Sequence, residues 1–62
     1  MKIVIQRKCN RWINVSNYNS EIKELYENLE EAEKEMDALK ELQPHAEYRL
    51  AEWIGGRKYR AI

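Results

Sequence analysis

The sequence has one cysteine and one histidine, and this scarcity bears on two classes of protein, those held by disulfides and those that bind zinc. It contains one cysteine, Cys9, so no intramolecular disulfide can form and a secreted, disulfide-held scaffold is excluded. The single histidine, His45, is far from Cys9 in the sequence, and neither has a partner at the spacing that a zinc site needs. We therefore expect no metal and no cofactor.

Glycine, proline and long apolar runs are also scarce. No apolar run approaches the roughly 18 residues of a membrane span, and no signal-peptide core follows Met1. The only glycines, Gly55 and Gly56, follow a predicted helix, which is the wrong order for a phosphate-binding loop. These absences predict a cytoplasmic protein that does not contact a membrane.

Charge is balanced over the chain but not along it. The sequence has 11 basic and 11 acidic residues in 62, a length at which we expect a single domain with a marginal core. Residues 1–20 and 54–62 carry cations and no acid, whereas every acidic residue lies between Glu21 and Glu52. This segregation bears on the choice of partner rather than on the fold.

Residues 1–16 are predicted to form a β-hairpin. Its residues are rich in β-branched types, and Asn10 tolerates the left-handed conformation that a turn needs. A three-residue loop pairs Arg7 with Ile13, whereas a two-residue turn would split the apolar set between the two faces. With the three-residue loop, the inner face consists of Ile3, Ile5, Ile13 and Val15.

Residues 20–43 are predicted to form one long helix with an apolar stripe. The stripe residues recur at alternating steps of three and four: Ile22, Leu25, Leu29, Ala32, Met36 and Leu39. A helix of about 23 residues spans roughly 35 Å, whereas a compact chain with a radius of gyration near 10–11 Å is only about 27 Å across. We therefore predict a homodimer that associates through this stripe.

The chain after Pro44 is predicted to form a second, shorter helix over residues 44–54, ended by the glycine pair. Because the apolar spacing continues through Pro44, one kinked continuous helix is the alternative. Residues 57–62 are predicted to form a short strand on the edge of the hairpin, with a frayed tail as the alternative. The expected fold class is α+β.

No catalytic constellation is apparent. Carboxylates are abundant between Glu30 and Glu41, but they fall outside the apolar stripe, where a solvated helix surface is expected. General acid–base catalysis needs partly buried carboxyl groups with separated pKa values. We predict that the protein is not an enzyme and has no catalytic residues.

Trp12 is the centre of a predicted partner-binding surface. In the preferred register it lies on the hairpin face away from the helix, whereas a slip of one residue would place it in the core. Tryptophan, tyrosine and arginine are the residues that most often anchor interfaces. The predicted surface consists of Trp12, Lys8, Arg7, Arg11, Tyr59, Arg57, Lys58 and Arg60.

Two functions fit this pattern. Basic strands with interleaved aromatic residues are typical of nucleic-acid binding, but zero net charge favours cations that face the acidic helices. The preferred hypothesis is therefore a protein-binding module, with nucleic acid as the alternative partner. In size and charge segregation the chain resembles small phage-encoded inhibitors and transcription-associated accessory proteins. That resemblance implies a host enzyme or defence complex as the partner.

Overall fold

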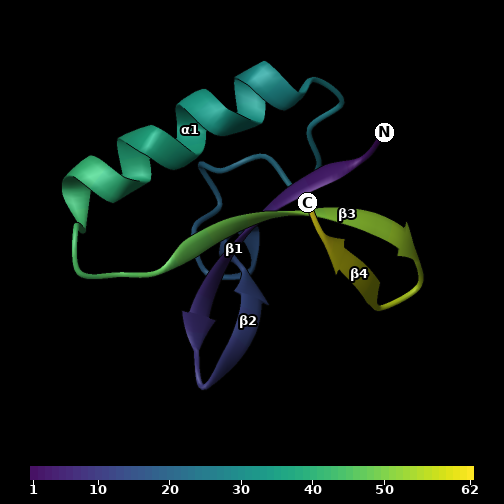
Figure 1. Ribbon diagram of the computed structural model, residues 1–62, viewed down its shortest axis with the longest axis horizontal. Coiled ribbons are helices and arrows are strands. Elements are labelled where there is room, and N and C mark those ends of the chain that lie inside the picture. Colours follow the sequence, from purple (N-terminus) through teal and green to yellow (C-terminus); the bar gives the residue numbers. More distant parts are fainter.

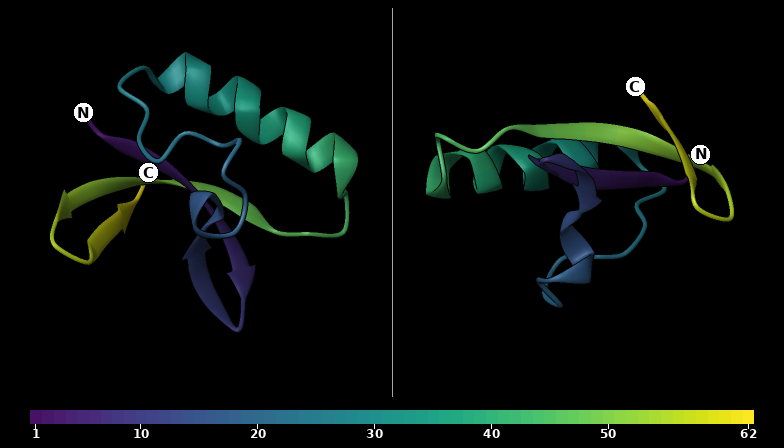
Figure 2. Two further views of the ribbon diagram at one scale, coloured as in Figure 1. Left: turned by 180° about the vertical axis from the view of Figure 1, so that it is seen from behind. Right: turned by 90° about the horizontal axis from the view of Figure 1, so that it is seen from below.

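The computed structural model describes residues 1–62 as a four-stranded antiparallel sheet and one helix (Figure 1). The elements are β1 (Ile3–Cys9), β2 (Arg11–Asn14), a 3-10 turn (Val15–Asn17), α1 (Leu29–Leu42), β3 (Tyr48–Gly55) and β4 (Lys58–Ala61). The strands lie in the order β2-β1-β3-β4, and α1 packs on the two central strands. Both hairpins curl away from α1 (Figures 1 and 2). The predicted α+β class is confirmed.

The first hairpin has the predicted register. Arg7 pairs with Ile13, and Asn10 takes a positive φ of 70° at the turn. The turn is tighter than the predicted loop, because Cys9 and Arg11 are themselves paired. The strand ends at Asn14, and Val15 begins the 3-10 turn, where its side chain is buried. The register therefore keeps Trp12 on the side of the hairpin away from the core.

The core lies between α1 and the covered face of the sheet. Alternation along β1 directs Ile3 and Ile5 to this face, and β3 contributes Leu50. Met36 and Leu39 of α1 pack at its margin. The buried cluster consists of Ile3, Ile5, Val15, Ile22, Tyr26, Ala32 and Leu50.

The predicted helix over residues 20–43 is wrong in its first third, because α1 begins at Leu29. Residues before it form turns that bury Ile22 and Tyr26, and the backbone groups of Tyr26 and Ile3 exchange two hydrogen bonds of 2.7 Å. The Asn28 side chain then caps the helix by accepting from the amides of Glu30 and Glu31. Pairing with β1 and burial of two large side chains outweigh the modest helix propensity of this segment.

The predicted second helix over residues 44–54 is also wrong, as is the kinked continuous helix. Tyr48–Gly55 forms the strand β3, which pairs with β1 on one side and β4 on the other. The glycine pair makes the β3–β4 turn, with φ of 126° at Gly55 and 53° at Gly56. Positive φ suits a hairpin turn as well as a helix end, so these glycines did not discriminate between the two structures.

The C-terminal residues form β4, but this strand pairs with β3 and not with the edge of the first hairpin. On the β1 side of the first hairpin the edge is occupied by β3, and the outer side of β2 stays unpaired. The radius of gyration is 10.7 Å, within the range expected for a compact chain of this length.

The predicted dimerisation stripe is divided between several environments. Ile22 and Ala32 are buried, Met36 and Leu39 pack against the core, and Leu25 and Leu29 remain 37% and 39% exposed. A helix of 14 residues is about 21 Å long, within the 29 Å extent of the molecule. The excess length that suggested a second copy is therefore absent. Homodimerisation through the helix stays a prediction that light scattering would test.

Burial raises the pKa of the Tyr26 phenol above its ordinary value, with the nearby Glu35 charge acting in the same direction. Because the folded pKa exceeds the unfolded one, this group's contribution to stability is complete below pH about 10 and is lost as pH rises through the folded pKa. Tyr26→Phe should therefore reduce the fall in stability between neutral pH and pH about 11, measured by urea unfolding. Tyr18→Phe, at an exposed tyrosine, is the control; equal alkaline slopes for Tyr26→Phe and wild type would contradict the burial argument.

No helix in the structure has the length and apolar content needed to cross a membrane.

Candidate functional site

The sheet face opposite α1 carries polar and aromatic side chains that we call the open face. Cross-strand partners share a face, so the pairs Gln6–Asn14, Gln6–Arg49 and Trp53–Tyr59 lie together on it. Along β1 and β3 its members alternate with the core residues Ile3, Ile5 and Leu50. The open face consists of Gln6, Lys8, Trp12, Asn14, Arg49, Trp53 and Tyr59, arranged around the buried Val4 and Ala51.

One line of side-chain hydrogen bonds crosses all four strands of this face. Arg49 Nε donates to Gln6 Oε1 at 2.9 Å, and Gln6 Nε2 donates to Asn14 Oδ1 at 2.9 Å. Asn14 Nδ2 then donates to the Tyr59 hydroxyl oxygen at 3.0 Å. The line therefore runs from β3 through β1 and β2 to β4.

The last of these bonds shows how strongly the sheet curls. The strands β2 and β4 are the two edges, and a flat sheet would hold them about 14 Å apart, three strand spacings. Asn14 and Tyr59 both project from the same face, yet their side chains meet across it. The two hairpins therefore enclose the open face between them. Figure 1 shows both hairpins below α1.

Two hollows lie side by side in this enclosure, and both are lined by Asn14, Asn17 and Tyr59. The basic hollow, about 410 Å³, is completed by Gln6, Arg11, Trp12, Ile13 and Arg57. The apolar hollow, about 310 Å³, is completed by Val4, Glu24, Leu25, Trp53 and Gly56. No carboxylate lines the basic hollow, and one lines the apolar hollow.

Both tryptophans of the chain belong to the open face, and each has a cation over its ring. The Arg49 guanidinium lies 4.4 Å from the Trp12 ring centroid, and the Lys2 ammonium lies 5.1 Å from that of Trp53. The Trp53 indole also donates to the Gly56 carbonyl at 2.8 Å, across the β3–β4 turn. The bond between Arg49 and Gln6 holds the guanidinium in place, so the position of the cation over Trp12 is set by the sheet.

The direction of the hydrogen-bond line determines what the open face can offer a ligand. Arginine has no acceptor, so Gln6 must present its carbonyl to Arg49 and its amide to Asn14. Asn14 then donates to Tyr59, whose own hydroxyl proton remains free to donate. The terminal guanidinium nitrogens of Arg49 are donors too. The face therefore presents donors, which suit a ligand rich in acceptors.

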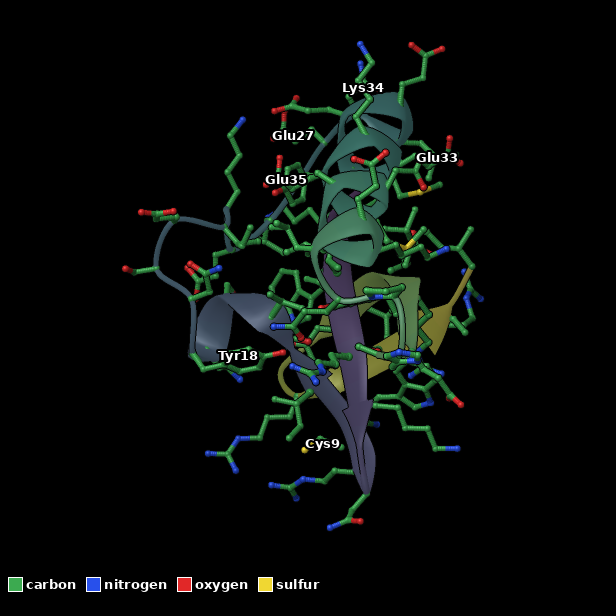
Figure 3. All side chains as sticks on the ribbon, turned by 90° about the vertical axis from the view of Figure 1, so that its left-hand side faces the viewer. Cys9, Tyr18, Glu27, Glu33, Lys34 and Glu35 are labelled. Carbon is green, nitrogen blue, oxygen red and sulfur yellow. The ribbon has the colours of Figure 1, made fainter.

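The acidic surface lies on the other side of the sheet. Helix α1 carries six acidic and two basic residues, and Figure 3 shows Glu33, Lys34 and Glu35 at the end of the molecule opposite Cys9. The two ion pairs in the structure, Lys23–Glu31 and Arg60–Glu52, include no residue of the open face. The hydrogen bond from Lys23 to Glu31 raises the pKa of that lysine. The cations of the open face are thus not neutralised by α1.

The predicted partner-binding residues divide between the two sides of the sheet. Five of them line the enclosure or share the open face: Lys8, Arg11, Trp12, Arg57 and Tyr59. Strand alternation places Lys58 and Arg60 on the opposite face, where Arg60 pairs with Glu52. Arg7 likewise turns to the covered side, near Leu39 and Tyr48. These three residues do not join Trp12.

Sequence reasoning missed four residues as members of a site: Gln6, Asn14, Arg49 and Trp53. Gln6 and Asn14 were placed on the correct hairpin face without a role. Arg49 and Trp53 were assigned to a helix, although Tyr48–Gly55 is rich in aromatic and branched apolar residues and ends at a glycine pair, which is also typical of a strand. The strand pattern was the signal that could have found them.

No group of three or more His, Cys, Asp or Glu side chains is arranged to hold a metal ion. Comparisons with family models, with curated proteins and with solved structures found no match to this chain.

Proposed function

We propose that this protein is a binding module, not an enzyme, that holds a negatively charged macromolecule on its open face. The observation that carries the proposal is the basic hollow, where Arg11 and Arg57 lie beside Trp12 with no carboxylate in the lining. The donors left free along the hydrogen-bond line add to the preference for an anion.

Zero net charge does not oppose this proposal. Charges in water are screened over about 8 Å at physiological salt. The six carboxylates of α1 lie on the other side of the sheet from the basic hollow, and no carboxylate lines that hollow. The field that a ligand meets is therefore the local one of the basic hollow.

With this geometry, a polyanion such as nucleic acid becomes the preferred candidate partner and a protein becomes the second. The sequence favoured a protein partner because its cations were expected to face acidic helices, and α1 instead lies on the far side of the sheet. A protein remains the second candidate, because Trp12, Tyr59 and Arg11 are of the types that anchor protein interfaces. An acidic segment of that partner protein would bind on the open face. Inhibition of a host enzyme or defence complex would then result from the binding of such a segment.

Heparin, a soluble polyanion, tests the proposal without assuming the partner. Wild-type protein should be retained on immobilised heparin at low salt, and Arg11→Gln with Arg57→Gln should elute at clearly lower salt. The matched control is Lys34→Gln with Lys40→Gln, which removes the same charge from exposed positions of α1 and should elute as wild type. Equal losses in the two double variants, or no retention of wild type, would overturn the proposal.

A further inference from the structure

We infer that the macromolecule held on the open face is a single-stranded nucleic acid, an inference that rests on the proposed function. Its first support is the placement of the aromatic rings. Trp12 and Tyr59 line the basic hollow, and Trp53 lines the adjoining one. Aromatic rings along a cationic groove are the surfaces on which successive unpaired bases stack.

The cations stand where the phosphates of such a strand would pass. Arg11 and Arg57 line the basic hollow together with Trp12, and they come from two different hairpins, Arg11 from β2 and Arg57 from the β3–β4 turn. Arg49 covers one face of that ring and leaves the rest of it to the hollow. A base lying on the exposed part of the ring would therefore have two further guanidinium groups in the same hollow for its flanking phosphates.

The polar groups of the open face match the edges of bases. The free proton of the Tyr59 hydroxyl and the terminal nitrogens of Arg49 are donors, and bases and phosphates are rich in acceptors. An acidic peptide would satisfy the same cations, but its carboxylates make no use of three aromatic rings on one face. A duplex would satisfy them too, but its bases are stacked on one another and cannot reach the rings.

Binding should depend on the salt concentration and on whether the nucleic acid is single-stranded or a duplex. Two or three phosphates held by Arg11, Arg57 and Arg49 give a slope of log K against log salt of about −1.4 to −2.1. Because both tryptophans lie on the open face, binding should also quench the intrinsic fluorescence of the protein. Duplex of the same length should bind more weakly, because stacking on Trp12 is lost.

The experiment is a titration of the full chain with labelled oligo-dT and oligo-U of about 12 nucleotides, followed by anisotropy. Trp12→Ala should weaken binding by about 5- to 150-fold, the factor that one stacked base contributes. Trp12→Phe, which keeps a ring, should recover part of that loss. Tyr18→Ala removes an exposed aromatic residue outside the open face and should bind as wild type.

Circular dichroism and thermal melts establish that Trp12→Ala is folded, and Arg11→Gln with Arg57→Gln supplies a second variant that leaves the ring intact. That double variant should lower the magnitude of the salt slope by about 1.4. Equal binding of duplex and single strand, or no effect of either variant, would overturn the inference. Binding to heparin and polyglutamate without binding to oligonucleotides would overturn it too, while leaving the proposed function in place. Failure to bind any polyanion would overturn both.

Discussion

Replacing Ile5 by alanine is expected to leave a large fraction of the chain unfolded at room temperature. The Ile5 side chain is 2% exposed and lies in the cluster between β1 and α1. Removing a buried isoleucine side chain costs about 2–5 kcal/mol. A core of this size supplies only about 3–5 kcal/mol of folding free energy, so the substitution removes most of it. Urea unfolding followed by circular dichroism measures the loss.

Ile54→Ala is the matched control for this result. It removes the same atoms from β3, but Ile54 is 54% exposed because α1 does not reach that end of the strand. The expected cost is under about 1 kcal/mol. Equal destabilisation by both substitutions would contradict the observed arrangement.

Gln6→Leu is expected to have the second largest effect, on both stability and binding. Gln6 is 3% exposed, and both ends of its amide are hydrogen-bonded. An apolar side chain at this position leaves Arg49 and Asn14 without their partner, at a cost of about 1–3 kcal/mol. Release of Arg49 from its place over Trp12 should also weaken retention on heparin. Urea unfolding and heparin elution measure the two effects.

Gln6→Glu separates the shape of this side chain from its hydrogen bonding. The introduced carboxylate can accept from Arg49, and Asn14 can reverse its amide to donate to it. The carboxylate offers an acceptor to the Arg49 guanidinium when it is ionised, which for an ordinary glutamate is above pH about 4.3. Above pH about 5 the variant should therefore be more stable than Gln6→Leu. Equal stability of the two variants across this range would show that the bond to Arg49 contributes nothing.

The same substitution should nevertheless reduce anion binding. A reversed Asn14 amide presents its oxygen to Tyr59, so the hydroxyl proton is used inside the network and no longer faces the ligand. The added negative charge acts in the same direction. A Gln6→Glu protein that binds heparin as tightly as wild type would mean that the hydrogen-bond line has no part in the binding face.

Short-range pattern determined the first hairpin and the placement of Trp12. Asn10 supplies the one left-handed residue of the turn, and the register that pairs Arg7 with Ile13 places Ile3, Ile5 and Ile13 on one face. A slip of one residue, the alternative that would have placed Trp12 in the core, exchanges the two faces of the hairpin, and the observed pairing excludes it. The α+β class followed from the same patterns.

Tertiary structure alone decided the length of α1 and the identity of β3. Residues 20–28 contain good helix formers, but Tyr26 lies against Ile3, and the hydrogen bonds between their backbones hold this segment out of the helix. The spacing of Leu50 and Ile54 suits a helix as well as a strand face. What selects the strand is the free side of β1, which must pair with a distant segment.

The open face depends on both levels. Trp12, Arg11, Arg57 and Tyr59 were recognisable from residue type and hairpin register, whereas the bond between Arg49 and Gln6 joins residues 43 positions apart. No local pattern encodes such a contact, because it exists only when β3 pairs with β1. The curl that joins Asn14 to Tyr59 needs all four strands in place. Local sequence determined which side chains are available to form the open face, and long-range strand pairing decided which of them lie together.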